Sequence, residues 1–229
     1  MQSVTERIKM KKPLTYNYST TAIIERGHEL AILAKEDLKV LEKFGASQKD
    51  IDQLEKKIAE YKKFPEDAHF AEIVREKTLL KYEAEQKLIT TVRNFFLQFS
   101  IIIPSKKESK KYFPSQKLTG LKTKDLIAIA EKAITVGKRF KDQFARLELP
   151  DTNLDEIRTL ISATKKTVKS LDQVRVDRIK NTNKRRDLGS TLYEQIVKLC
   201  RYGKIYWKDR DEERYKKYLL YVKNDNKID

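Results

Sequence analysis

Apolar residues recur at intervals of three and four along most of this chain, which is the spacing of one face of an α-helix. The first such series begins after Ser19 or Thr20, either of which can cap a helix, and continues to Gly45. A second, shorter series follows Ser47, which together with Asp50 resembles an acidic capping box. The sequence therefore predicts two helices that return antiparallel to each other.

A longer helix is predicted from Glu66 to about Ile103, where Pro104 ends it. At about 1.5 Å per residue this segment would measure about 55 Å. One apolar stripe runs along it, made of Ile73, Leu80, Ala84, Leu88, Val92, Phe95, Phe99 and Ile102.

Residues 104–122 contain two prolines and a glycine among serines and lysines, and they predict a basic loop. Thr123 is expected to cap the next helix, whose apolar and small residues continue to Leu147. A turn is expected at Pro150.

The segment 154–206 has two stretches of apolar residues with heptad spacing in one register. Neither Pro nor Gly interrupts residues 154–188, which favours one long helix, although the polar residues 181–183 are equally compatible with a break. Beyond it, Asp209 with Glu212 predicts a cap for a short C-terminal helix. The positions between the two heptad stretches are Arg175, Arg178, Thr182 and Arg185.

These elements predict an all-α protein, an elongated bundle of long amphipathic antiparallel helices with coiled-coil-like seams. Only 6 Gly and 5 Pro among 229 residues are too few for the many turns of a β protein. The expected organisation is a basic arm (1–18), a helical hairpin plus long helix (19–103), the basic loop (104–122), a long helical hairpin of the same bundle (123–208), and a short C-terminal helix and tail (209–229).

Cysteine content and apolar runs bear on the compartment. Cys200 is the only cysteine, so no intramolecular disulfide forms, and the N-terminal residues do not have the pattern of a signal peptide. The most apolar run, residues 95–103, is much shorter than the ~20 residues of a membrane-spanning helix, and is expected in the core. We expect a cytoplasmic protein.

Basic residues are concentrated in two segments of a chain whose net charge is +16. Residues 104–124 carry seven lysines and one glutamate, and residues 175–187 carry six basic and two acidic residues. If the helices on either side of Pro150 form an antiparallel hairpin, the two segments share one end of it. The resulting hypothesis is an anion-binding patch, against the simpler interpretation of solvated charges. Its residues are Lys106, Lys107, Lys110, Lys111, Arg175, Arg178, Arg185 and Arg186.

Aromatic and basic residues also alternate from Arg201 to Tyr221, a mixture typical of single-stranded nucleic-acid platforms. The spacing of Tyr202 and Tyr206 equally fits a terminal helix docked on the bundle, and we favour this second interpretation.

Candidates for chemistry are few. Both histidines follow a glutamate by three residues, which is the ligand spacing of dimetal helical bundles. The two further glutamates that such a site needs are missing from the seams of the second half, so no metal and no other cofactor is expected. Cys200 has no histidine signature near it, and no phosphate-binding loop, dinucleotide fingerprint or nucleophile elbow is present. The four weak metal candidates are Glu25, His28, Glu66 and His69.

The sequence therefore predicts a non-enzymatic structural or protein-interaction module, with a protein partner or self-association and no small-molecule substrate. The alternative is an electrostatic binder of nucleic acid or anionic membrane through residues 104–124 and 175–187. A third option is insertion into a membrane after a conformational change, with residues 95–103 entering first.

Overall fold

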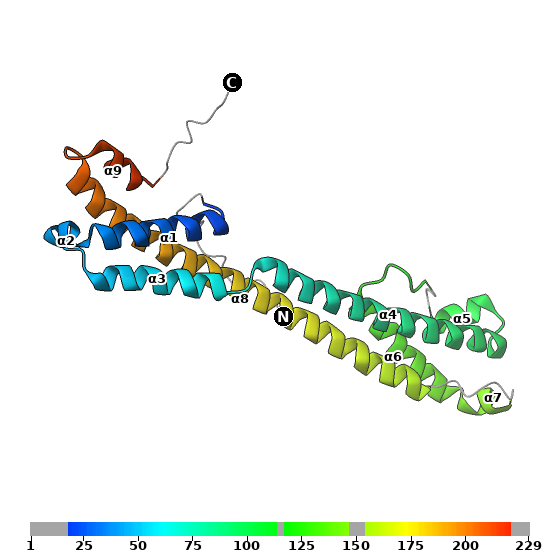
Figure 1. Ribbon diagram of the computed structural model, residues 1–229. Helices are drawn as coiled ribbons and strands as arrows, with labels where there is room; N and C mark the ends of the chain where they lie inside the picture. The colour runs from blue at the N-terminus through cyan, green and yellow to red at the C-terminus, as the bar shows by residue number, and fades with distance from the viewer. Residues whose placement is uncertain (1–17, 114–116, 147–153, 221–229) are drawn as a thin grey trace, which may run out of the picture. The chain divides into compact units, whose positions relative to one another are not determined.

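A computed structural model describes residues 18–113, 117–146 and 154–220 of the protein (Figure 1). The elements within these ranges are all helices, so the predicted all-α bundle is confirmed. Apart from Tyr18, the predicted N-terminal arm lies outside the described residues, as do the turn at Pro150 and the end of the C-terminal tail. The helices are α1 (Thr20–Glu36), α2 (Leu38–Leu41), the 3-10 helix η2 (Glu42–Phe44), α3 (Gln48–Lys63), α4 (Asp67–Ile102), α5 (Lys106–Tyr112), α6 (Thr123–Arg139), α7 (Lys141–Arg146), α8 (Leu154–Trp207) and α9 (Glu212–Lys217).

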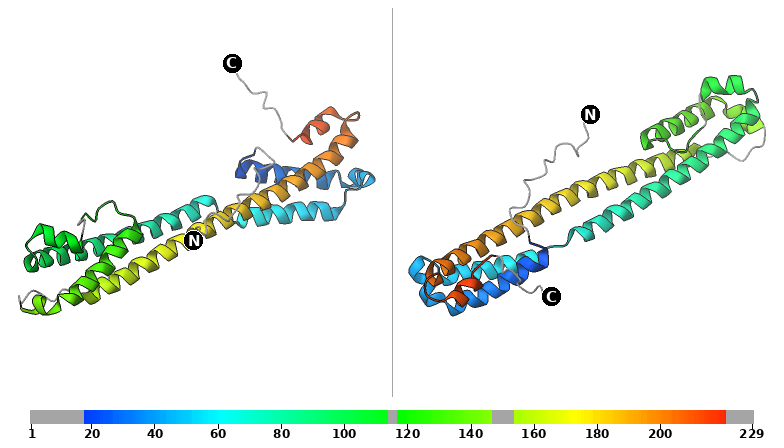
Figure 2. Two further views of the ribbon diagram at one scale, coloured as in Figure 1. Left: turned by 180° about the vertical axis from the view of Figure 1, so that it is seen from behind. Right: turned by 90° about the horizontal axis from the view of Figure 1, so that it is seen from above.

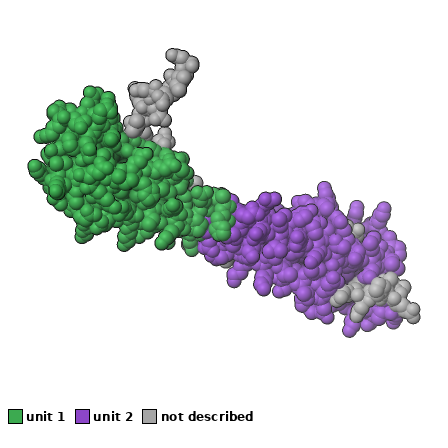
Figure 3. Space-filling view, in the orientation of Figure 1, with its two compact units in different colours: residues 1–69, 178–229 green, residues 70–177 purple. Residues whose placement is uncertain are grey.

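The chain divides into two compact units, drawn in different colours in Figure 3. Unit 1 comprises residues 1–69 and 178–229, and unit 2 comprises residues 70–177. Helix α8 supplies its first part to unit 2 and its second part to unit 1, and it is one uninterrupted α-helix. The prediction of a continuous helix is thus confirmed. Within residues 181–183, the Thr182 hydroxyl oxygen lies 2.9 Å from the Arg178 carbonyl oxygen, one helical turn earlier, as in a continuous helix.

In unit 1, α1 and α3 form an antiparallel hairpin that packs beside the second part of α8 (Figure 2). The Thr20 and Tyr61 hydroxyls lie 3.4 Å apart at one end of this hairpin. Towards the other end, Lys35 forms an ion pair of 2.5 Å with Glu55. The capping box predicted at Ser47 and Asp50 is present and begins α3.

The first predicted helix was too long. Helix α1 ends at Glu36, and the chain reaches Gly45 through the short α2 and η2. The interruption falls at Asp37, whose carboxylate is buried and accepts hydrogen bonds from Trp207 of α8 and Arg214 of α9. A tertiary contact therefore overrides the local helical pattern. Gly45, with φ +89°, ends the segment as predicted.

In unit 2, α8 runs antiparallel to both α4 and α6. The Glu131–Lys165 ion pair joins the middle of α6 to α8, and a Cβ on Gly137 would lie 2.6 Å from the side chain of Leu154. Helices α4 and α6 run parallel, because Thr123 donates to Glu85 while Gly137 lies beside Phe95, ten residues further along α4. The segment between them must therefore return along the unit.

Several local predictions in the second half were wrong. The supposed basic loop contains α5, whose first turn is capped by the side chain of Ser105. Lys122, not Thr123, is the N-cap of α6, because the Thr123 hydroxyl is used by Glu85. The helix expected to reach Leu147 is interrupted at Phe140. Asp211, not Asp209, caps α9.

The C-terminal aromatic residues pack on unit 1. Tyr218 is fully buried, and Tyr202, Tyr206 and Trp207 lie against the core that α1, α3 and α8 share. The prediction of a docked terminal helix is confirmed. Tyr218 sits directly on Gly203, where a Cβ would lie 2.1 Å from the Tyr218 Cδ1.

Gly203→Ala is therefore expected to destabilise unit 1 by about 1–3 kcal/mol, because the ring of Tyr218 must leave its site. The gain in helix propensity from Gly to Ala is only about 1 kcal/mol and does not offset this loss. Urea unfolding followed by the fluorescence of Trp207, the chain's one tryptophan, measures the effect. Arg201→Ala, at an exposed position of the same helix, is the control. Equal stability of Gly203→Ala and wild type would show that the ring can be accommodated elsewhere.

Candidate anion-binding surface

The eight basic residues predicted to form one patch are divided between the two units. Arg178, Arg185 and Arg186 belong to unit 1, whereas Arg175 and the four lysines belong to unit 2. Their surroundings differ in one respect that decides whether they can bind a ligand, namely whether a carboxylate or carbonyl of the chain already holds them.

Arg178 is held by Asp67, the first residue of α4. Its Nε and Nη2 donate to the two carboxylate oxygens at 3.1 and 2.5 Å, and the Thr182 hydroxyl donates to the same carboxylate at 2.9 Å. The hydrogen bonds from Arg178 hold the pKa of Asp67 below its usual value. A bidentate pair of this kind occupies one edge of the guanidinium and gives Arg178 a partner within the chain.

Arg185 is held by the connection between α3 and α4. Its Nη1 donates to the carbonyls of Phe64 and Pro65 at 2.7 and 3.1 Å, and its guanidinium lies 4.9 Å from the centre of the Tyr61 ring. These carbonyls follow the end of α3, where the backbone lacks helical partners. Arg178 and Arg185 therefore fasten the α3–α4 connection to α8.

Arg175 and Arg186 have weaker contacts with the rest of the chain. Arg175 lies 3.8 Å from Asp172 on the exposed side of α8. Arg186 lies close enough to Asp67 to lower the pKa of that carboxyl through its charge. Nothing in the sequence indicated that Asp67 would be the partner of Arg178, because the two residues are 111 positions apart in the chain.

The four lysines of α5, which we call the lysine surface, differ from Arg178 and Arg185 in their surroundings. Lys106, Lys107, Lys110 and Lys111 are all exposed. Within the part of the chain that the structure describes, no carboxylate forms an ion pair with any of these four ammonium groups. Glu108 is the one acidic residue of α5. The lysine surface therefore presents charge that the fold leaves to solvent or to a ligand.

A cavity of about 440 Å³ adjoins the lysine surface, between the end of α4 and α5. Its polar side chains are two lysines and two serines, and no carboxylate lines it. The Ser100 hydroxyl donates to the Leu97 carbonyl at 2.6 Å, so the lysine ammonium groups are the donors that this cavity offers to phosphate oxygens. We call it the lysine cavity; its lining is Ser100, Ile103, Pro104, Lys106, Ser109, Lys110 and Phe113.

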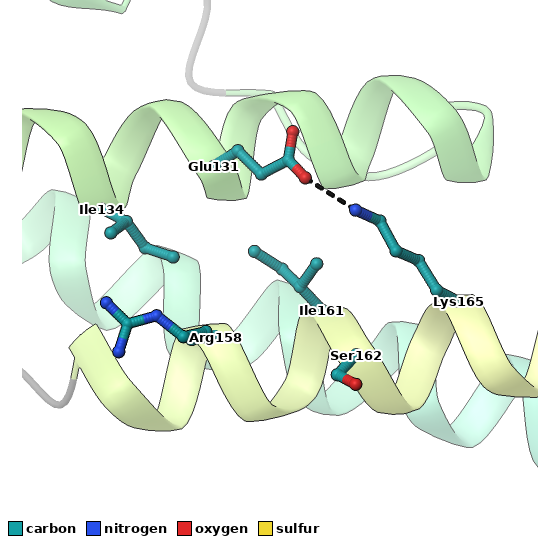
Figure 4. A pocket seen from close by; sticks show the side chains of 6 residues that line it. All are labelled: Glu131, Ile134, Arg158, Ile161, Ser162 and Lys165. Carbon is teal, nitrogen blue, oxygen red and sulfur yellow. Dashed lines mark hydrogen bonds and ion pairs between the residues drawn. The ribbon is translucent and has the colours of Figure 1, made fainter.

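A second cavity of about 440 Å³ lies between α6 and α8 (Figure 4). The Lys165 ammonium at its edge is paired with the Glu131 carboxylate at 2.8 Å, and Arg158 forms an ion pair with Asp155. Ile134 and Ile161 face each other across the middle. Since its cationic groups are already paired, this cavity is a weaker candidate for an anion.

Aliphatic side chains are exposed beside the lysine cavity. Leu97 is 67% exposed and Ile101 is 54% exposed, on the turns of α4 that carry Ser100. Leu97, Ser100, Ile101 and Pro104 are spaced as one helical face. The sequence prediction that the whole of residues 95–103 belongs to the core was wrong for these two residues.

The phenylalanines of the same segment point the other way. Phe95, Phe96 and Phe99 are buried in the core of unit 2. Helical periodicity places Leu97 and Ile101 on a different face of the helix from these phenylalanines. The exposure of the two residues could therefore have been predicted from the sequence. No described helix is both long and apolar enough to cross a membrane.

The weak metal candidates are not gathered into a site. Glu25, His28, Glu66 and His69 are each exposed, and nowhere in the described ranges do three His, Cys, Asp or Glu side chains lie as a metal would need. Cys200 is buried, and desolvation raises the pKa of its thiol. A raised pKa opposes formation of the nucleophilic thiolate.

Comparison of the chain with protein-family models, with curated proteins and with solved structures found no match. The function must therefore be inferred from the geometry of the lysine surface and its surroundings.

Proposed function

We propose that this protein is a non-enzymatic helical interaction module that attaches to an anionic partner through the lysine surface. The observation that carries the proposal is that four exposed ammonium groups of α5 have no carboxylate partner among the described residues. Clustered positive charge raises the local concentration of an anionic partner and accelerates its association. The arginines of unit 1 are not part of this proposal, because Arg178 and Arg185 already bind groups of the chain.

The lysine cavity supports the same proposal. Lys106 and Lys110 lie one helical turn apart and both line it, together with the hydroxyl-bearing Ser100 and Ser109. The C-terminal end of α4 carries a partial negative charge. The positive potential at this place therefore comes from the lysines, and removing them should remove binding.

A variant with Lys106, Lys107, Lys110 and Lys111 changed to Gln tests the proposal. The probe is fluorescently labelled random-sequence duplex DNA, used as a soluble polyanion across a salt series. Wild type is expected to bind at low salt and to weaken steeply as salt rises. The variant should lose at least about tenfold in affinity, and the magnitude of the slope of log K against log salt should decrease by up to about 4.

The matched control removes the same net charge elsewhere. Lys39, Lys43, Lys49 and Lys56 are exposed lysines of unit 1, and their joint change to Gln should alter affinity by less than about threefold. Equal losses in the two quadruple variants would mean that net charge alone drives binding. Failure of wild type to bind at low salt would remove the proposal altogether.

A further inference from the structure

We infer that the anionic partner of the lysine surface is a bilayer containing anionic phospholipids, onto which unit 2 docks with the end of α4 and with α5. This inference rests on the proposed function and specifies its partner. It combines three neighbouring features, which are the four exposed lysines of α5, the cavity that Lys106 and Lys110 line, and the exposed Leu97 and Ile101.

The exposed aliphatic side chains distinguish a bilayer from a soluble polyanion. Leu97 and Ile101 are one turn apart, and Ser100 of the lysine cavity lies between them on the same face of α4. At a membrane, such side chains enter the boundary between headgroups and acyl chains while neighbouring lysines remain at the phosphates. Lysine is suited to this arrangement, because its aliphatic stem can lie in the apolar layer with the ammonium group outside it.

Nucleic acid fits the same surface less well. Platforms for single strands expose aromatic rings on which bases stack. In unit 2, Phe95, Phe96, Phe99 and Phe113 are buried against one another. The Tyr112 ring is also engaged, by Phe99 and Phe140 at 5.6 and 5.3 Å between ring centres.

A protein partner also fits less well. The centres of protein interfaces are depleted in lysine and enriched in aromatic side chains and arginine. The lining of the lysine cavity contains no arginine, and its one aromatic residue, Phe113, is buried. The lysine cavity, which no carboxylate lines, has room for one phosphate headgroup, with Lys106 and Lys110 as donors and Ile103 and Phe113 as apolar neighbours.

Co-sedimentation with large unilamellar vesicles tests the inference. Vesicles of phosphatidylcholine with phosphatidylserine are expected to bind the wild-type protein, whereas vesicles of phosphatidylcholine alone bind it at least tenfold more weakly. Each lysine near an anionic surface contributes about fivefold in affinity.

Two double variants separate the bilayer from a soluble polyanion. Leu97→Ser with Ile101→Ser should weaken vesicle binding by about tenfold or more and leave DNA binding unchanged. The control, Leu79→Ser with Leu80→Ser, removes two aliphatic side chains that are 55% and 47% exposed nearer the start of α4, and should bind vesicles as wild type does.

A second comparison tests the cavity. Lys106→Gln with Lys110→Gln changes the two lysines that line it, and Lys107→Gln with Lys111→Gln removes the same charge outside it. The first pair is expected to lose at least threefold more vesicle affinity than the second. Equal losses would overturn headgroup binding in the cavity.

The outcomes distinguish this inference from the proposed function. Binding of DNA without binding of anionic vesicles overturns the membrane inference and leaves the anionic attachment standing. Vesicle binding that is insensitive to Leu97→Ser with Ile101→Ser overturns the insertion of α4. If the wild-type protein binds neither DNA nor anionic vesicles, both the proposed function and the membrane inference are wrong.

Discussion

Replacing Asp37 with alanine is expected to lower the free energy of unfolding of unit 1 by about 2–5 kcal/mol. Its carboxylate is only 5% exposed. It accepts hydrogen bonds from the Trp207 indole and the Tyr218 hydroxyl, each at 2.9 Å, and forms an ion pair of 2.6 Å with Arg214. Alanine removes the acceptor of the Trp207 and Tyr218 donors, whereas Arg214 keeps its ion pair of 3.0 Å with Glu36.

The cost arises mainly from the groups that remain. Each buried donor without an acceptor costs about 1–3 kcal/mol, and Trp207 and Tyr218 supply two such donors. Burial, and after it the hydrogen bond to Asp37, raises the pKa of Tyr218. Burial acts in the variant as well, so the Tyr218 hydroxyl stays protonated and continues to need an acceptor. Because Trp207 ends α8 and Tyr218 follows α9, the release of these two side chains also weakens the docking of the C-terminal helix.

Trp207 fluorescence during urea unfolding reports this change directly, since the indole N–H is one of the three donors. Asp52→Ala is the control, because Asp52 is exposed and accepts one side-chain hydrogen bond, from Gln48 at 2.8 Å. That variant should differ from wild type by less than about 0.5 kcal/mol. A loss under 1 kcal/mol in Asp37→Ala would contradict the role assigned to the buried carboxylate.

Replacing Phe99 with alanine is expected to lower the free energy of unfolding of unit 2 by about 3–5 kcal/mol. The Phe99 side chain is fully buried, and its ring centre lies 5.9 Å from that of Phe95 within α4. It also contacts Phe113 at 5.6 Å and Phe140 at 5.4 Å, which follow α5 and α6. Alanine removes the ring that connects these three helices and leaves a cavity.

Urea unfolding followed by far-UV circular dichroism measures this loss. Leu97→Ala is the control, two residues away on the exposed side of α4, and should change stability by less than about 0.5 kcal/mol. Comparable losses in the two variants would mean that the faces of α4 are wrongly assigned, which would also remove Leu97 from the proposed membrane contact.

The helices themselves were largely predictable, because their signals are local. Heptad spacing in α8 identified residues that are buried in the structure, among them Ile157, Leu171 and Leu192. Gly45 and Pro104 ended their helical segments as the chemistry of those residues requires. The errors at Asp37 and Thr123 have one cause, which is a distant partner that captures a polar side chain.

The sequence predicted which types of residue form the candidate site, but not which basic residues belong to it. The concentration of lysine in residues 104–124 and of arginine in residues 175–187 is a property of the sequence. The sequence prediction treated the two groups alike, because the sequence does not show which carboxylate or carbonyl each basic residue will bind. Folding pairs Arg178 with Asp67 and leaves Lys106 and Lys110 at a cavity.

The sequence by itself determined the helices, most of their ends and the total charge, since these depend on periodicity, on glycine and proline, and on composition. Only the tertiary structure decided which basic groups the fold uses, where the lysine cavity forms, and that Leu97 and Ile101 are exposed beside buried phenylalanines. The physical reason is that pairing and burial depend on contacts between residues far apart in the chain, as between Asp67 and Arg178, which no local pattern encodes.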